Sequence, residues 1–249
     1  MIGSAATLAD LPIAPVWHET IDTLPDTPTI LIANEFLDAS PVMQHEISEQ
    51  TWYIRGVGLD GAGQLEFVRK DSYPDDPTWL ERCAPLAPGD LLEKQEFVWA
   101  SHINRLVAAA PFAALFIDYG HFDWVPGDTL QAVRNHHAEH PLAAPGEADL
   151  SVQVCFADFR AMMEVEYQGK NWPAGICDGP VTQAEFLGRL GIIERASKLM
   201  AANPAKAAGI EAGVARLMAP GGMGTRFKAI GVRGSGLPVL PGFEGGVKW

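Results

Sequence analysis

Short uninterrupted apolar runs alternate along this chain with segments whose apolar residues recur at helical spacing. The runs cover residues 29–33, 114–117 and 227–232, and Lys228 weakens the last of them. Continuous runs of this length are typical of strands that helices cover on both faces. Helical spacing covers residues 95–110, which Pro111 ends, and recurs from Ile210 to Met218. Strands that alternate with helices predict an α/β fold.

Two local signals add elements to this outline. Thr182 followed by Glu185 has the spacing of a capping box, which predicts that a helix begins there. Residues 51–68 indicate two strands around the turn pair Asp60-Gly61. We expect this hairpin to be an antiparallel insertion beside the main sheet.

Two glycine-rich stretches are not interpreted as nucleotide sites. Gly56–Gly61 matches the spacing G-x-G-x-x-G, but residues 64–68 after it alternate as in a strand. A dinucleotide loop needs a following helix, whose N-terminus meets the phosphates. Pro220–Gly224 also precedes a predicted strand. Both stretches are therefore predicted to be turns.

Composition narrows the class of protein. The chain has 249 residues, 47% of them apolar, and 18 Lys and Arg against 31 Asp and Glu give a net charge of −13. The apolar content excludes a disordered chain, and the acidic balance argues against nucleic acid and anionic membranes as partners. No run approaches the roughly 18–20 apolar residues of a membrane span. The three cysteines, Cys83, Cys155 and Cys177, are an odd number at wide spacings, which is typical of a reducing compartment. The N-terminal residues show neither a secretory signal nor an Arg-rich transit peptide, so we expect a cytoplasmic location.

Histidines gather at one place in the sequence. On a helix His136 and His140 would share a face and could chelate a metal, with Glu139 beside them. The order is not H-E-x-x-H, however, and no distant third ligand is evident. We expect no metal site, with His136, His137 and His140 on a polar surface or pocket loop. A metal hydrolase that uses His136 and His140 is kept as a minor alternative.

Polar residues follow the first two apolar runs. Asn34, Glu35 and Asp38 come after the first run, and 118–121 (Asp-Tyr-Gly-His) come after the second. Ligands in open α/β sheets bind just beyond the carboxyl ends of the strands. Such residues also cap helices, but two polar strand ends in one sheet favour a site. Two carboxylates and an amide suit an amine, a guanidinium or a sugar hydroxyl.

These residues resemble a known family. Residues 33–42 (ANEFLDASPV) resemble the A-N-E-F-x-D-A-x-P-V signature of MidA-like methyltransferases. The resemblance runs over the chain from about Val16, through the segments 117–121 (IDYGH), 127–130 (GDTL), 145–150 (PGEADL), 179–187 (GPVTQ with Phe186-Leu187) and 223–228 (MGTRFK).

The resemblance implies a class I S-adenosylmethionine-dependent methyltransferase with a Rossmann-like α/β fold, an inserted hairpin and inserted helices. The cofactor is then S-adenosyl-L-methionine. The partner is a protein that presents an arginine, as in the relatives that assist complex I assembly in the mitochondrial matrix. The resemblance implies that Asn34, Glu35 and Asp38 lie where cofactor and substrate meet. We predict that these three are catalytic, with Glu35 holding the guanidinium and Asn34 also touching the cofactor. The predicted substrate-binding residues are Trp52, Asp118, Tyr119 and His121, with Asp118 and Asp38 as supports and with Tyr119 and His121 as pocket wall.

This sequence differs from the family pattern in the segments that bind the cofactor. The family's glycine-rich loop and its ribose-holding acidic residue precede the segment that resembles Val16, and no such loop occurs here. We therefore expect residues 1–28 to connect to a missing cofactor-binding part with the first strands. Residues 29–237 would be the C-terminal portion of the domain, and 238–249 an irregular tail. The alternative is a non-catalytic fragment or binding module that keeps the substrate-facing half; a homodimer is possible in either case.

Overall fold

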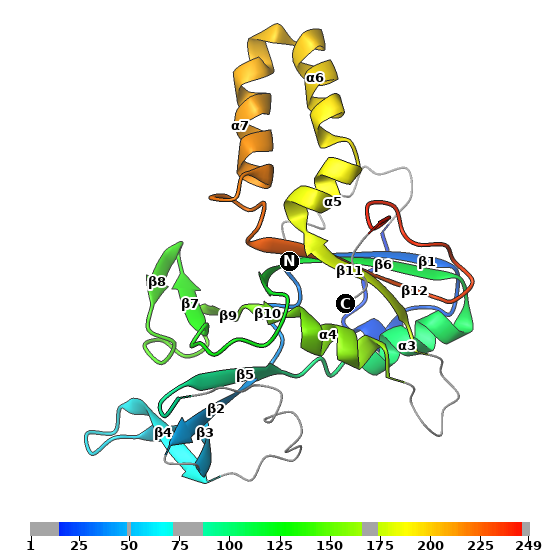
Figure 1. Cartoon of the computed structure of the whole chain (residues 1–249). Coiled ribbons are helices and arrows are strands. Elements are labelled where there is room, and N and C mark those ends of the chain that lie inside the picture. The colour runs from blue at the N-terminus through cyan, green and yellow to red at the C-terminus, as the bar shows by residue number, and fades with distance from the viewer. Residues whose placement is uncertain (1–14, 49–50, 72–86, 166–173, 246–249) are drawn as a thin grey trace.

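The main sheet of the protein carries the predicted polar strand ends. The structure, a computed structural model, describes residues 15–48, 51–71, 87–165 and 174–245, so Cys83 lies outside it. Its strand order is β1-β6-β12-β11, and β10 pairs with the end of β6 (Figure 1). β1 and β10 run parallel to β6, whereas β12 runs antiparallel to it. The strands are β1 (Thr29–Asn34), β6 (Phe112–His121), β10 (Val154–Cys155), β11 (Ile176–Thr182) and β12 (Phe227–Arg233).

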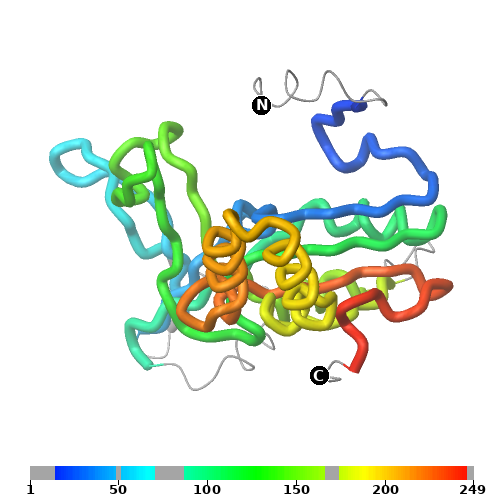
Figure 2. Tube along the Cα trace, turned by 90° about the horizontal axis from the view of Figure 1, so that it is seen from above, coloured from blue at the N-terminus to red at the C-terminus, as the bar shows by residue number. Residues whose placement is uncertain are grey.

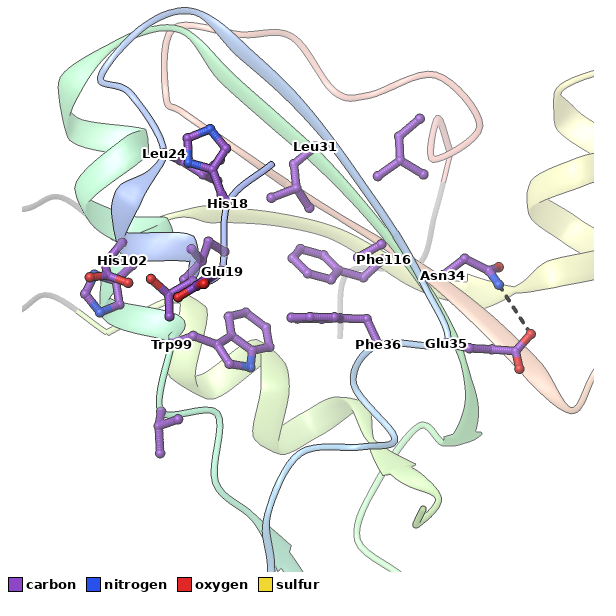
Figure 3. A pocket seen from close by; sticks show the side chains of 16 residues that line it. His18, Glu19, Leu24, Leu31, Asn34, Glu35, Phe36, Trp99, His102 and Phe116 are labelled. Atoms are coloured by element: carbon purple, nitrogen blue, oxygen red, sulfur yellow. Dashed lines mark hydrogen bonds between the residues drawn. The ribbon is translucent and has the colours of Figure 1, made fainter. Parts of the chain in front are cut away.

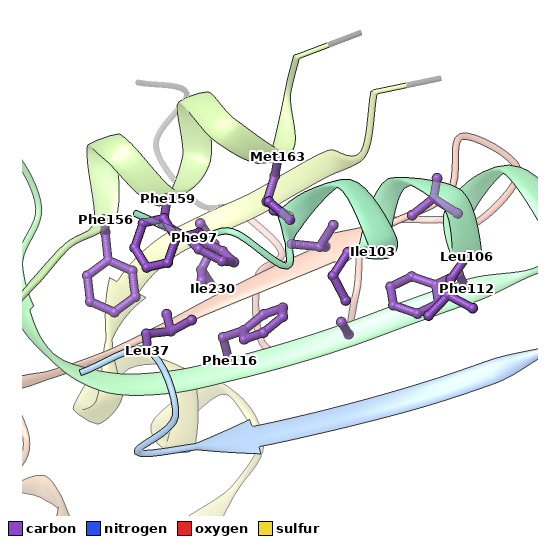
Figure 4. Close-up of a cluster of buried hydrophobic side chains, with 14 of the residues drawn as sticks. Leu37, Phe97, Ile103, Leu106, Phe112, Phe116, Phe156, Phe159, Met163 and Ile230 are labelled. Carbon is purple, nitrogen blue, oxygen red and sulfur yellow. The ribbon is translucent and has the colours of Figure 1, made fainter. Parts of the chain in front are cut away.

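One face of this sheet packs against two helices, α3 (Ala100–Ala109) and α4 (Phe156–Met163). Alternate residues of β6 point toward them because side chains along a strand alternate between its faces. Phe116 and Phe159 form the centre of this core, with ring centroids 4.9 Å apart. Figure 4 shows these rings between the sheet and the helices. This aromatic core supports the part of β6 that leads to the polar strand end.

The opposite face is covered by α5 (Gln183–Arg189) and by the chain after β12. Thr182 and Glu185 form the predicted capping box at the start of α5, so that prediction is confirmed. Residues 238–245 of the expected tail contain no helix or strand. Phe243 is nevertheless buried there, and its ring lies 5.1 Å from that of Phe186. The tail therefore helps to close the second face of the sheet.

Two smaller sheets lie beside the main one (Figure 1). The hairpin expected over 51–68 is present, and the Gly56–Gly61 stretch forms strand and turn within it. It belongs to a four-stranded sheet of order β4-β3-β2-β5, made of β2 (Val42–Ser48), β3 (Thr51–Leu59), β4 (Leu65–Asp71) and β5 (Leu91–Gln95). A three-stranded sheet that the sequence analysis did not expect has the order β8-β7-β9, from β7 (Gln131–Arg134), β8 (His137–Glu139) and β9 (Asp149–Ser151).

A helical arm projects from the body of the protein, as Figures 1 and 2 show. It consists of α6 (Ile192–Ala202) and α7 (Ala207–Met218), joined by the short 3-10 helix η2 (Pro204–Lys206). The helix predicted to end at Met218 is thus confirmed. Within the part of the chain that the structure describes, no helix is long and apolar enough to cross a membrane. The remaining element, the 3-10 helix η1 (Ile21–Thr23), precedes β1.

Three expectations about these elements are wrong. β1 is not covered on both faces, because it is an edge strand on which Ile30 and Ile32 are 84% and 72% exposed. The helix expected from residue 95 begins at Ala100, because Gln95 completes β5. β6 does not end at Ile117 but continues to His121, where its last residues pair with β10 and β12. The second polar strand end therefore lies within a strand and is held by its ladder.

Candidate functional site

The residues that follow β1 form a turn at the carboxyl end of the strand. The backbone N–H of Glu35 donates to the carbonyl oxygen of Ile117 over 2.9 Å, which extends the pairing of β1 with β6 by one bond. Glu35 then takes a φ of +50°, in the left-handed region that non-glycine residues seldom adopt. The Asn34 side-chain amide donates to Oε1 of Glu35 over 3.3 Å. Both side chains are exposed, and Figure 3 shows them at the end of the strand.

Asp118 supports this turn from within the protein. Its side chain is fully buried, and its Oδ2 accepts hydrogen bonds from the backbone N–H groups of Phe36, Leu37 and Asp38 over 3.0, 2.9 and 3.2 Å. Its Oδ1 accepts from the N–H of Tyr119 over 2.9 Å. The sequence analysis counted Asp118 among the substrate-binding residues, as a support. With no exposed surface, the carboxylate instead fixes the backbone that carries Glu35.

Tyr119 and Asp38 form the second contact between β6 and the turn. The Tyr119 hydroxyl donates to Oδ2 of Asp38 over 2.5 Å. Burial, together with the hydrogen bond to Asp38, raises the pKa of Tyr119 to about 12. The phenol therefore stays protonated and remains a donor at neutral pH. Asp38 is in turn held in one orientation by this hydrogen bond.

The other predicted substrate residues lie farther along the strands. His121 ends β6, and burial and then the nearby charge of Lys228 lower its pKa, which favours the neutral imidazole. The Lys228 ammonium group donates to the carbonyl oxygens of Gly120 and Thr225, which fixes the backbone next to His121. Trp52 lies on β3, opposite Ile47, in the four-stranded sheet. The structure thus brings Asn34, Glu35, Asp38, Asp118 and Tyr119 together, with His121 at the end of the same strand and Trp52 on another sheet.

Gln95 is a site residue that the sequence analysis missed. Its side-chain amide donates to the carbonyl oxygen of Leu37 over 3.1 Å, and its Oε1 accepts from the N–H of Cys155 over 3.1 Å. A single glutamine within an apparent helical pattern carries no signal of this role. Only the tertiary structure places it beneath the turn.

A hollow of about 720 Å³ lies beside the edge strand β1. Apolar side chains from β1, from β6 and from the residues just before α3 form much of its wall, including Leu31, Phe116 and Trp99. Phe36 reaches into it, with its ring 5.2 Å from that of Trp99. Figure 3 shows these side chains together with His18 and Glu19 of the N-terminal segment. Asn34 and Glu35 lie at the end of this hollow nearest the carboxyl edge of the sheet.

Asn34 is the candidate residue for contact with a cofactor. Asn34 offers an exposed amide at the carboxyl end of an open edge strand, the place where ligands bind in such sheets. Among residues 15–48, 51–71, 87–165 and 174–245, no glycine-rich loop leads from a strand into a helix. The donors that such a loop supplies are therefore not among the described groups.

The histidine segment does not have the geometry expected of a chelating helix. Asn135 and His136 have φ values of +50° and +65° and form the turn between β7 and β8. The His140 ring lies 5.7 Å from the ring of Phe67. In the described part of the chain, no group of three or more His, Cys, Asp or Glu side chains is arranged to hold a metal ion. The shared helical face required for the metal hydrolase alternative is thus contradicted.

The buried carboxyl group of Asp118 predicts a pH dependence of stability. Burial, and then the charge of Asp38, raise the pKa of Asp118 from 3.8 to about 6. The folded protein then holds this proton more tightly than the unfolded chain, so stability contributed by the neutral group is lost as the pH rises from about 4 to about 6. The loss amounts to about 3 kcal/mol at most.

Urea unfolding of the protein and of Asp118→Asn at several pH values measures this effect. Because the other titrating groups are common to both proteins, the difference between their unfolding free energies isolates Asp118. We expect the unsubstituted protein to lose stability relative to Asp118→Asn as the pH rises through this window. Parallel pH profiles would contradict the assignment.

Comparison with known proteins shows the family to which the sequence is similar. Residues 4–172 match the model of a family described as S-adenosyl-L-methionine-dependent methyltransferases. The chain is 31% identical over 243 residues to the mitochondrial protein arginine methyltransferase NDUFAF7 of Danio rerio, which covers 92% of this chain and 52% of the relative. It is 32% identical over 223 residues to the NDUFAF7 homologue of Drosophila melanogaster, with 85% and 48% covered. The chain thus spans about half the length of these curated relatives.

A solved structure has the same fold. A Burkholderia thailandensis protein bound to S-adenosyl-homocysteine matches 91% of this chain and 59% of its own, with a TM-score of 0.76 and 24% sequence identity. At this identity the likeness concerns the fold. It agrees with the α/β class expected from the alternating strands and helices, and with the Rossmann-like fold that the family resemblance implies.

Proposed function

This chain belongs to the S-adenosyl-L-methionine-dependent methyltransferase family, and from that premise we propose that it supplies the substrate-facing part of an enzyme that methylates a protein arginine. The observation that carries the proposal is the Glu35 carboxylate, exposed at the carboxyl end of β1 in a turn that buried groups hold. The arginine substrate rests further on the names of the NDUFAF7 relatives.

The chemistry of the turn suits a guanidinium group. A carboxylate pairs with a guanidinium through two parallel hydrogen bonds, which orients the group and keeps electron density on its nitrogens. In the proposed site Glu35 holds the guanidinium, and Asn34 limits the motion of the Glu35 carboxylate through their hydrogen bond. Asp38, fixed by Tyr119, adds negative charge on the same side.

Methyl transfer of this kind depends mainly on positioning. S-adenosyl-L-methionine, when bound, supplies an activated methyl group on a sulfonium. The residues of this chain then need to aim one guanidinium nitrogen and exclude competing orientations, since alignment alone contributes much of the rate in such reactions. Asn34 is the residue that we assign to the cofactor as well as to Glu35. Trp52 and His121 remain proposals as outer substrate contacts.

The open side of β1 is where we place the remainder of the cofactor site. Among the described residues no strand pairs with the outer edge of β1, and Ile30 and Ile32 leave apolar surface exposed there, which is an unfavourable arrangement for an edge strand. A further parallel strand with a glycine-rich loop would cover both. The curated relatives are about twice as long as this chain, which leaves room for such a segment.

The cellular location and the biological role of the protein are inferred from the same relatives. Both curated relatives are mitochondrial proteins. We therefore propose the mitochondrial matrix for a eukaryotic source and the cytoplasm otherwise, with a complex I assembly role as the biological setting. A homodimer and the absence of nucleic acid as a partner stay predictions.

A chimera tests the proposed function. The part of the Danio rerio relative that the resemblance places upstream is joined in front of residue 1, and the chimera and the chain alone are titrated with S-adenosyl-L-methionine by calorimetry. We expect the chimera to bind the cofactor at micromolar concentration and to methylate an arginine-containing peptide, as read by mass spectrometry, and the chain alone to bind weakly.

Two outcomes would contradict the proposal in different ways. A chimera that binds the cofactor but leaves the arginine peptide unmodified would overturn the substrate class. A chimera that binds no cofactor would favour the binding-module alternative. That alternative is supported by the observation that the described residues contain no glycine-rich loop between a strand and a helix. In that case the chain should still capture the arginine peptide, and Glu35→Ala should abolish the capture.

A further inference from the structure

The turn after β1 is held by side chains that belong to distant parts of the chain. Its three successive N–H groups, from Phe36 to Asp38, all donate to one oxygen of Asp118. Its carbonyl groups are held as well, because the Leu37 oxygen accepts from the Gln95 amide and the Asp38 oxygen accepts from the N–H of Val152. Donors and acceptors of the turn are therefore both satisfied from outside it.

Gln95 connects the turn to a second element. Its amide nitrogen donates to the carbonyl oxygen of Leu37, while its Oε1 accepts from the N–H of Cys155, which ends β10 and directly precedes α4. The side chain is buried, so neither bond is shared with bulk water. Loss of this one amide would release the turn from both β5 and the start of α4.

Glu35 lies between two fixed points. Its own N–H is bound to Ile117, and the three N–H groups that follow it are bound to Asp118. A non-glycine residue with a φ of +50° leaves that conformation readily unless its neighbours prevent it. The hydrogen bonds that prevent it are made by the backbone N–H groups of Glu35 and of the three residues after it, so none of them occupies the Glu35 carboxylate.

We propose that Gln95 and Asp118 are positioning residues that hold Glu35 in its left-handed conformation, with its carboxylate directed outward at the carboxyl edge of the sheet. As a statement about catalysis this rests on the proposed function, since Glu35 is the residue that would meet the guanidinium. The claim that the two residues hold the turn rests on the hydrogen bonds alone. Neither residue touches the substrate in this assignment.

Amide hydrogen exchange on the chain itself tests the hold on the turn. The variants are Gln95→Leu and Asp118→Asn. The matched controls are Gln44→Leu and Asp178→Asn, which alter buried side chains that bond to Glu93 and Asp128, and to Arg233 and Leu240, instead of to the turn. We expect exchange at Phe36, Leu37 and Asp38 to become at least about 10-fold faster in the first pair only. The N–H to Hα coupling of Glu35, which reports its φ, should change in the same two variants.

Methyl transfer by the chimera tests what this hold does. We expect Gln95→Leu to lower kcat by about 10-fold to 10²-fold, because a small misplacement of an orienting group has effects of that size. The affinity for S-adenosyl-L-methionine should stay unchanged. In a Glu35→Gln background the same substitution should lower kcat little further, because Gln95 affects the reaction only through the Glu35 carboxylate, which is then absent.

Each result has a defined consequence. Unchanged amide hydrogen exchange at the turn in Gln95→Leu and Asp118→Asn would contradict the claim that these residues hold the turn. Faster exchange with an unchanged kcat, or full additivity with Glu35→Gln, would overturn the positioning role. An unsubstituted chimera without methyltransferase activity would overturn the proposed function, and the exchange data would still decide whether these residues hold the turn.

Discussion

Glu35→Gln is expected to lower the rate of arginine methylation by about 10²-fold to 10³-fold, a loss typical of removing one precisely placed polar group from an active site. Glutamine keeps the size of the side chain and one acceptor oxygen. It loses the charge and the paired acceptors that a guanidinium needs for a bidentate contact. The Asn34 amide can still donate to the glutamine oxygen, so the turn should keep its shape.

The measurement is kcat of the chimera on an arginine-containing peptide, with the cofactor affinity determined in parallel. Glu66→Gln is the matched control, because Glu66 is also exposed but lies on the β4 strand of the four-stranded sheet. We expect Glu66→Gln to keep the full rate and both variants to bind the cofactor normally. A Glu35→Gln protein that keeps most of its activity would remove Glu35 from the reaction.

Phe116→Ala is expected to lower the free energy of unfolding by about 3–5 kcal/mol, the usual cost of emptying a fully buried phenylalanine site. Phe116 has no exposed surface and lies on β6, between β1 and β12. Its ring is 4.9 Å from that of Phe159 and stacks on Trp99 at 5.9 Å. The surrounding strand ladders limit how far the backbone can close the cavity.

Phe36→Ala provides the comparison for this measurement. Phe36 also contacts Trp99, but its side chain is 44% exposed at the hollow beside β1. Its replacement should therefore cost about 1 kcal/mol or less. Urea denaturation with unchanged slopes distinguishes the two cases, because equal slopes mean that both variants unfold from equally compact states. Equal losses in the two variants would contradict the central place of Phe116 in the core.

Local sequence signals predicted the elements that depend on neighbouring residues. The capping box at Thr182 is present because both of its hydrogen bonds lie within four residues. The hairpin at Asp60-Gly61 formed for the same reason, since its turn and its alternating strands are all local. The helix expected from residue 95 was placed too early because Gln95 follows the helical spacing but pairs with Val42 in a sheet.

The candidate site was predicted in part. The polar residues Asn34, Glu35 and Asp38 after the first apolar run were found because a strand end is visible in the sequence. Asp118 was predicted as a support, but its hydrogen bonds to the turn were not, because its contacts to Phe36 and Asp38 join residues about 80 positions apart. No sequence signal indicated the three-stranded sheet of residues 131–151 either, because its strands are too short for a clear period.

The sequence by itself predicted the α/β class, the family through the resemblance of its motifs, and the place of the candidate site. These signals are visible because apolar runs, caps and motifs consist of residues close together along the chain. The tertiary structure alone decided that β1 is an open edge with Ile30 and Ile32 in water, and that Gln95 and Asp118 hold the turn of Glu35. The reason is physical: burial and hydrogen bonding between distant segments exist only once the strands have paired. A side chain therefore acquires these roles from its partners in space.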